Sequence, residues 1–227
     1  MSKRTEPGPV PRDRARCVVG HGRRAHCFDA GMGELLLVRH GETAWSKSGQ
    51  HTGRTDLPLT AYGERQAAAL APVLARRTLV AAFSSPLVRA WRTAELAGMS
   101  PRLDQDLVEW DNGEYESLTT LQIRARRTGW WLWADGAPGG EDAEQVGERC
   151  ARTIARVAPL LEQGDVALFG HGHSLCALAA VWVGLPAHRG GILKMDAASL
   201  GALGAYHDHR VITSWNDVTA YPEEHQP

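Results

Sequence analysis

The sequence lacks any long hydrophobic run. Its 227 residues are 43% hydrophobic and 22% charged, and no apolar stretch approaches the roughly 20 residues that cross a membrane. No apolar segment near the amino terminus resembles a signal peptide. The net charge is only −1, which gives no reason to expect nucleic acid or an anionic membrane surface as a partner. Composition therefore predicts an ordinary globular protein with one main domain.

Cysteine is also scarce. The chain has four cysteines, namely Cys17, Cys27, Cys150 and Cys176, and their scattered positions do not form the spacing of a disulfide framework. Such usage is typical of a reducing compartment. We therefore expect a cytoplasmic protein.

Residues 1–31 lack a periodic apolar pattern and carry three prolines, several glycines and scattered arginines. Such a segment buries too little surface to offset its ordering entropy, so we expect a disordered extension. One hypothesis is that Met32 is the true translation start, which mass spectrometry of the native protein would test. The extension contains zinc-type residues at Cys17, His21, His26 and Cys27, but their motif context favours chance.

The remaining residues, 32–227, indicate a single domain. The first stretch of this domain is the most informative part of the sequence. Leu35–Val38 is a short apolar run that is too short for a helix and is typical of a strand buried on both faces. It ends at Arg39-His40-Gly41. In open α/β sheets, ligands bind at the carboxyl ends of such strands, so this point is a candidate site.

Apolar strands and amphipathic helices alternate along the remaining chain. This order predicts a three-layer α/β/α sandwich with a mostly parallel central sheet. Further strands are expected at Leu79–Phe83, within the short extended stretch Pro101–Glu109, and at Val166–Phe169, Ile192–Met195, Ser199–Tyr206 and Val211–Trp215. Helices are expected at 60–76, 85–98, 119–127, 142–163 and 174–183.

Several helix boundaries have sequence signals. Thr60 is expected to cap its helix, with Glu64 completing a capping box, and Pro72 should kink or shorten the same helix. Ser85 is a good N-cap, and Pro86 suits the first helical position.

Charged and imidazole side chains should converge if the three main strands are neighbours. Arg39 and His40 end the first strand, Arg89 lies in the first turn of the helix after the second, and His171 ends the third. Guanidinium groups suit the geometry of phosphate, so we predict an anion site. Glu109 is the acid placed by a similar argument, although Glu114 and Glu116 compete for its role.

Four segments together resemble the histidine phosphatase superfamily, also called phosphoglycerate-mutase-like. R-H-G-E-T at Arg39–Thr43 resembles its signature, and S-S-P-L-V-R-A-W-R-T-A at Ser84–Ala94 resembles the segment with its second arginine. The segments L-V-E-W-D-N-G-E-Y-E at Leu107–Glu116 and G-H-G-H-S-L at Gly170–Leu175 are similar to those carrying its acid and second histidine. The four occur in the family's order.

The resemblance implies phosphoryl transfer through a phosphohistidine. By position, His40 would attack phosphorus, while Arg39, Arg89 and His171 would hold the phosphoryl oxygens. Glu109 would protonate the leaving oxygen and then activate water, for which we expect a raised pKa from partial burial and the phosphate charge. No metal and no cofactor are expected, because arginines neutralise the phosphate. The substrate would be a small phosphorylated metabolite.

The loop Trp45–Thr60 resembles the branch that contains fungal sedoheptulose-1,7-bisphosphatase and bacterial sugar-phosphate or acid phosphatases, as does P-G-G-E at Pro138–Glu141. This likeness implies a phosphate and sugar pocket made by Ser46, Thr52 and Gly53, with Thr43 beneath and Gly172 beside the second histidine. Two positions depart from the branch. Cys176 replaces an arginine that would hold a distal phosphate, and Ser117 replaces a glycine near the acid.

Other readings stay open at this point. The closest is a 2,3-bisphosphoglycerate-dependent phosphoglycerate mutase, although Glu109-Trp110-Asp111-Asn112 stands where mutases have an E-R-H-Y-like segment. A non-catalytic phosphate-binding module and a protein phosphatase are the others. His173 could pair with His171 on a metal but lacks a third ligand, and the tryptophans at 130, 131 and 133 could cap a substrate or pack in the core. The oligomeric state is open, with a homodimer among the options.

Overall fold

The computed structural model describes residues 32–220. The expected extension 1–31, including its zinc-type residues, lies outside the described residues, as does the end of the chain from 221. Within them a sheet has the strand order β3-β2-β4-β1-β5-β6. The strands β3, β2, β4 and β1 are parallel, whereas β5 and β6 pair antiparallel. Their bounds are β1 Leu35–Arg39, β2 Leu79–Ser84, β3 Arg102–Leu103, β4 Asp165–Gly170, β5 Leu200–Tyr206 and β6 His209–Asp217.

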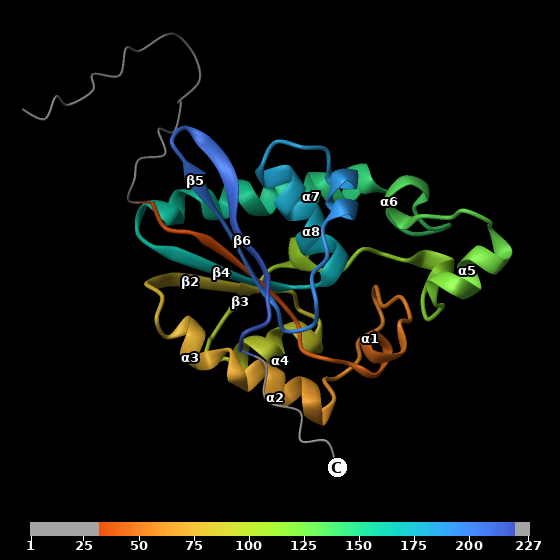
Figure 1. Cartoon of the computed structure of the whole chain (residues 1–227), viewed down its shortest axis with the longest axis horizontal. Coiled ribbons are helices and arrows are strands. Elements are labelled where there is room, and N and C mark those ends of the chain that lie inside the picture. The colour runs from red at the N-terminus through yellow and green to blue at the C-terminus, as the bar shows by residue number, and fades with distance from the viewer. Residues whose placement is uncertain (1–31, 221–227) are drawn as a thin grey trace, which may run out of the picture.

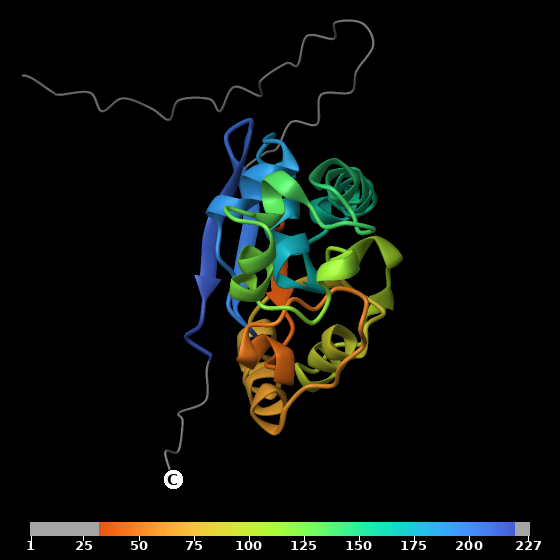
Figure 2. The same ribbon diagram turned by 90° about the vertical axis from the view of Figure 1, so that its right-hand side faces the viewer.

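Helices cover both faces of the sheet, which confirms the expected three-layer α/β/α sandwich (Figure 1). One face carries α2 Ala61–Ala69, α3 Ala71–Leu74 and α4 Val88–Leu96, and the other carries α7 Ala143–Val157 and α8 Gly172–Trp182. The shorter helices α1 Ala44–Ser48, α5 Thr120–Arg126 and α6 Leu132–Asp135 lie toward one end of the sheet, as Figure 2 shows from the side. Four 3₁₀ helices complete the described elements: η1 Gln105–Leu107, η2 Gly113–Tyr115, η3 Ala158–Glu162 and η4 Ala187–Ile192.

Strand β1 belongs to two hydrophobic cores at once. Its alternate side chains Leu35 and Leu37 pack in the core beneath α7 and α8, whereas Leu36 and Val38 pack in the core on the other face. All four are fully buried. Full burial of such a side chain contributes about 1.5–3 kcal/mol, so the uninterrupted apolar run fixes β1 at the centre of the fold.

The expected cap of α2 at Thr60 is confirmed, but its capping box with Glu64 and the expected start of α4 are wrong. Thr60 caps α2 by accepting a hydrogen bond from the Gly63 amide, so Gly63 holds the position that a capping box would give to Glu64. Helix α4 begins at Val88, and its N-cap is Leu87 rather than Ser85. The hydrogen bond from the Leu87 amide to the Ser85 hydroxyl is long, at 3.3 Å. The break between α2 and α3 confirms the effect of Pro72.

Three expected extents are also corrected. Within Pro101–Glu109 only Arg102–Leu103 forms a strand, and η1 follows it. The expected strand Ile192–Met195 does not form, because the carbonyls of Lys194 and Met195 accept hydrogen bonds from the side chains of Trp215 and Arg39 instead of a neighbouring strand. Helix α7 ends at Val157 and continues as η3, which has a proline in its first turn. No helix within residues 32–220 is long and apolar enough to cross a membrane.

Candidate active site

The carboxyl ends of three parallel strands meet at one edge of the sheet. Arg39 in β1 is level with Gly170 in β4, and Ser84 in β2 is level with Phe169. The residues that follow these ends, His40, Ser85 and His171, therefore lie together. The convergence expected from the sequence is present.

His40 is buried with one ring nitrogen free. Its Nδ1 lies 2.7 Å from the Gly41 carbonyl oxygen. A carbonyl can only accept, so Nδ1 carries the proton and Nε2 keeps its lone pair. Burial, followed by the charges of Arg39 and Arg89, lowers the pKa of His40 well below its usual value. The ring is thus a neutral imidazole at neutral pH, with the Nε2 lone pair free.

Gly41 has a steric reason to be glycine. A Cβ atom at this position would lie 2.4 Å from the carbonyl oxygen of Gly63 in α2. The Gly41 amide donates to the Thr93 hydroxyl of α4 at 3.0 Å. Both contacts fix the backbone whose carbonyl orients His40.

Arg89 is completely buried and organises the neighbouring segments. Its two terminal nitrogens donate to the carbonyls of Thr55 and Gly53 at 2.8 and 2.9 Å. Its Nε donates to Nδ1 of His171 at 3.1 Å. Burial lowers the pKa of Arg89, although a guanidinium stays charged at any physiological pH.

His171 has the opposite tautomer to His40. Because its Nδ1 accepts from Arg89, the proton lies on Nε2, which donates to the Ser85 hydroxyl at 2.9 Å. Burial, then the charge of Arg89, lowers the pKa of His171 well below its usual value. The His171 and His40 rings meet edge to face with centroids 5.2 Å apart. The ring is therefore neutral, and its one N–H is engaged by the Ser85 hydroxyl.

Arg39 brings a cation with a spare donor. Its Nη1 donates to the Met195 carbonyl at 2.5 Å, whereas its buried Nε has no hydrogen-bond partner in the described part of the chain. Buried donors are almost always paired in proteins. Gly172 lies against this guanidinium, where a Cβ would come within 3.3 Å. The orphaned donor fits an anionic ligand in the pocket that Arg39 lines.

The Glu109 side chain is buried against the amino-terminal end of α8. Its Oε1 accepts from the amides of Trp110 and Ser174 at 2.8 and 2.9 Å, and its Oε2 accepts from the His173 amide at 3.1 Å. Burial by itself raises the pKa of this carboxyl. His173 and the three amides outweigh burial, and the resulting pKa lies below its usual value. We expected a raised pKa, and in this pocket the direction is opposite.

The competing acids are placed elsewhere. Glu114 is exposed. Glu116 accepts from the amides of Gly53 and Thr55, so it fixes the loop that Arg89 also holds. Glu109 alone of these three carboxylates lines the pocket.

A pocket of about 330 Å³ opens above His40. Of the residues expected to contact substrate, Ser46, Thr52 and Gly172 line it. Thr43 instead is fully buried and caps α1, exchanging hydrogen bonds with Ser46. Gly53 lies behind Arg89, where a Cβ would come within 2.7 Å of the Trp110 carbonyl oxygen, so it shapes the site from outside the pocket.

Two histidines of the pocket were not anticipated as site residues. His51 stacks on His173 with ring centroids 5.7 Å apart, and its Nε2 lies 3.0 Å from the Thr120 hydroxyl. Burial lowers the pKa of His51 to about 4, and burial also lowers that of His173. Nδ1 of His173 lies 3.8 Å from the Glu109 carboxylate. The repeated Gly-His at 170–173 is the one sequence signal that could have indicated His173 as a site residue.

The tryptophan cluster is mainly core. Trp130 and Trp133 are buried and contribute to the hydrophobic core, whereas Trp131 is exposed. Trp133 also lines the pocket, with its ring edge against His173. Packing is therefore the main role of these tryptophans, and the Trp133 ring also forms part of the pocket wall.

Both departures from the family pattern have structural effects. Cys176 lines the pocket, and burial raises the pKa of its thiol to about 12, so this position is uncharged. Ser117 has a φ of 67°, in the left-handed region that favours glycine. Its backbone pairs with His51 and with the Gln50 side chain, which places the strain next to the pocket.

Within residues 32–220, no group of three or more histidine, cysteine, aspartate or glutamate side chains is arranged to hold a metal ion. The charge that faces His40 comes from Arg39 and Arg89. At these strand ends, two neutral imidazoles, two guanidiniums and one carboxylate form an arrangement whose chemistry suits the binding of a phosphoryl group.

The family model of the histidine phosphatase superfamily (branch 1) matches residues 35–218. The chain belongs to this superfamily, and it is a phosphoric monoester hydrolase of the histidine phosphatase type. The resemblance stated from the four sequence segments is thereby confirmed.

Individual relatives support the phosphatase assignment. An acid phosphatase of Mycobacterium tuberculosis is 38% identical over 192 residues, covering 83% of this chain and 94% of that protein. Sedoheptulose 1,7-bisphosphatase of Saccharomyces cerevisiae is 37% identical over 182 residues, covering 66% of this chain and 67% of the yeast protein. The solved mycobacterial glucosyl-3-phosphoglycerate phosphatase in complex with VO3 has a TM-score of 0.74 and 31% identity, covering 81% of this chain and 98% of its own.

Proposed function

We propose that this chain hydrolyses a small phosphorylated metabolite, with a sugar phosphate as the favoured class, through a phosphohistidine at His40. The observation that carries the proposal is the free Nε2 of His40, set by the Nδ1 contact to Gly41. Relatives named acid phosphatase, sedoheptulose bisphosphatase and glucosyl-3-phosphoglycerate phosphatase support the substrate class.

In the first step Nε2 of His40 forms a bond to phosphorus as the ester P–O bond breaks. The spare Nε–H of Arg39 and the remaining N–H groups of Arg89 stabilise the developing charge on the phosphoryl oxygens. The Nε2–H of His171 joins them by exchanging the Ser85 hydroxyl for a phosphoryl oxygen. Glu109 gives its proton to the leaving oxygen.

In the second step water attacks the phosphohistidine, and Glu109 takes back a proton as inorganic phosphate leaves. The low pKa of Glu109 in the protein suits this base role. A bound phosphate dianion nearby raises the carboxyl pKa by like-charge repulsion. Substrate binding thus prepares the acid form that the first step needs.

The test is hydrolysis of p-nitrophenyl phosphate and a panel of sugar phosphates, without added metal and in the presence of EDTA. We expect activity in EDTA and a loss of at least about a thousand-fold in His40→Ala. An EDTA-sensitive activity or a fully active His40→Ala protein would overturn the mechanism.

The same panel separates the alternatives. A phosphoglycerate mutase, the activity in the name of the 29% identical Salmonella relative, would exchange phosphoglycerate isomers faster than it releases phosphate. A non-catalytic binding module would retain phosphate ligands with no turnover. The Glu109-Trp110-Asp111-Asn112 segment favours hydrolysis.

The uncharged thiol of Cys176 favours monophosphates over bisphosphates. Cys176→Arg should raise the ratio of kcat/KM for a sugar bisphosphate to that for the matching monophosphate. Cys176→Met is the control for side-chain volume. An unchanged ratio in the arginine variant would contradict this part of the proposal.

A cytoplasmic location, a homodimer and the lack of a nucleic-acid partner stay predictions of the sequence. So does the division into an extension 1–31 and a domain 32–227.

A further inference from the structure

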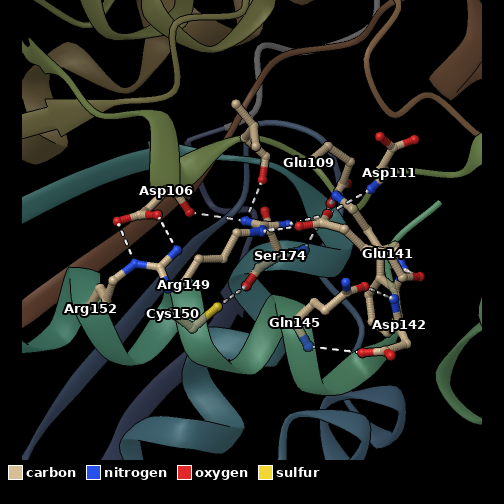
Figure 3. Close-up of polar contacts among 12 residues, drawn as sticks. Asp106, Glu109, Asp111, Glu141, Asp142, Gln145, Arg149, Cys150, Arg152 and Ser174 are labelled. Carbon is tan, nitrogen blue, oxygen red and sulfur yellow. Dashed lines mark hydrogen bonds and ion pairs between the residues drawn. The ribbon is translucent and has the colours of Figure 1, made fainter.

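Arg149 is a buried cation that does not reach the pocket. It lies in α7 and is only 4% exposed. Its Nε and Nη2 donate to the two carboxylate oxygens of Glu141 at 2.9 and 3.1 Å, a bidentate pair (Figure 3). Its Nη1 donates to the carbonyls of Asp106 and Val108 at 2.9 and 2.7 Å. Val108 directly precedes Glu109.

Glu141 holds the other side of the same segment. Its Oε2 accepts from the Asp111 amide at 2.9 Å, and its backbone carbonyl accepts from the Trp110 indole at 2.8 Å. Its own amide donates to the Asp111 carbonyl at 3.0 Å. Arg149 and Glu141 therefore bind the backbone immediately before and after Glu109 without contacting its carboxylate.

The Glu109 segment needs such support, because it lies in no helix or strand. It connects η1 and η2, whose hydrogen bonds reach only the Val108 amide at one end and the Asn112 carbonyl at the other. Only the Glu109 carboxylate is tied to α8, through the amides of His173 and Ser174. Proton transfer requires a group held within hydrogen-bond distance of the reacting oxygen.

We infer that Arg149 and Glu141 are positioning residues that hold Glu109 for proton transfer to the leaving oxygen. This inference rests on the proposed role of Glu109 as the general acid. A buried ion pair can also be merely structural, so the test must report on proton transfer rather than on folding alone.

The leaving group provides that readout. An alkyl alcohol such as glycerol leaves poorly as an alkoxide and needs a proton, whereas p-nitrophenolate leaves readily without one. A displaced general acid therefore slows β-glycerol phosphate much more than p-nitrophenyl phosphate. A general loss of folded protein slows both substrates equally.

The experiment measures kcat/KM for both substrates in Arg149→Met, Glu141→Gln and the reference variant Glu109→Gln. We expect Arg149→Met and Glu141→Gln to lose about 10- to 100-fold on β-glycerol phosphate, part of the 10²–10⁴-fold typical of a general acid. Their loss on p-nitrophenyl phosphate should be under about three-fold. Arg152→Met is the matched control, because Arg152 is exposed on the same helix and binds only the Asp106 carboxylate.

Equal losses on both substrates, or no loss on either, would overturn the positioning role. If Arg149→Met does not fold, Glu141→Gln carries the test with its volume unchanged. The proposed function fails separately, when the unmodified protein hydrolyses neither substrate or when Glu109→Gln shows no preference between them.

Discussion

Both ends of the central parallel strands carry arginine, but in different company. At the amino end, Arg77 pairs with Glu34 at 2.5 Å and with Asp165 at 2.8 Å. At the carboxyl end, Arg39 and Arg89 bind carbonyls and an imidazole, and within residues 32–220 neither forms an ion pair. At the amino end, the ion pairs of Arg77 neutralise its charge and connect the starts of β1 and β4. The carboxyl end leaves its positive charge without a carboxylate partner among the described residues, as the proposed phosphate site requires.

The largest effect is expected from breaking the carboxyl end. Arg39→Met should lower kcat/KM by about 10²–10³-fold, because a donor to the phosphoryl oxygens is lost. The free energy of unfolding should change by less than about 1 kcal/mol, since the lost bond to Met195 is offset by relief of repulsion from Arg89. Parallel kinetics and urea unfolding check both values, and a large loss of stability with full activity would reverse the assignment.

The next largest effect is expected from low pH, which should reduce the stability contributed by the histidines at the carboxyl end of the strands. Folding lowers the pKa values of four histidines at this end, His40, His51, His171 and His173. Below about pH 6.5 the unfolded chain therefore binds more protons than the folded protein, and the free energy of unfolding decreases as the pH is lowered. For His51, with a pKa of about 4, the loss between pH 6.5 and 5 is about 1.6 kcal/mol. Urea unfolding of His51→Gln should show a smaller loss over this range. His188→Gln, at an exposed histidine, is the control, and an equal loss in both variants would contradict the prediction.

A smaller effect is expected at the amino end. Arg77→Met should lower the free energy of unfolding by about 1–2 kcal/mol, because two carboxylates lose their cation at a partly exposed site. Its kcat/KM should match that of the unmodified protein. Together with Arg39→Met, this variant separates stability from activity. A drop in activity at equal stability would show that the two ends are not independent.

The smallest effect is expected from relieving the backbone strain at Ser117, next to the pocket. Ser117→Gly should stabilise the protein by about 1 kcal/mol, because its φ of 67° disfavours a side chain. Thermal unfolding measures the gain. Ser117→Ala keeps the Cβ and should give none, so stabilisation by alanine would point to a cause other than backbone strain.

The sheet and the convergence of Arg39, His40, Arg89 and His171 could be predicted from the sequence, because they depend on local signals. The apolar run of β1 and the Arg39-His40 pair that ends it are contiguous, and His171 follows β4 in the same way. Arg89 was expected in the first turn of a helix, and it is there even though that helix begins later than expected.

Other features depend on distant parts of the chain. The lowered pKa of Glu109 comes from His173 and from amides that include those of α8, far along the chain, so no local pattern around Glu109 indicates it. His51 joins the pocket through contacts with residues distant in the sequence, namely its stacking on His173 and its hydrogen bond with Thr120. The expected strand at Ile192–Met195 failed because its carbonyls bind the side chains of Trp215 and Arg39, which no periodicity of the segment could indicate.

The pocket combines walls of different origin, and this shapes how the protein can evolve. Arg39 and His40 line it from the end of β1, whereas Gln50, Thr120 and Lys194 line it from segments outside the sheet. Substitutions in those segments can change which molecule is held while the attacking nitrogen stays in place. One inherited chemistry can therefore serve descendants with different metabolites.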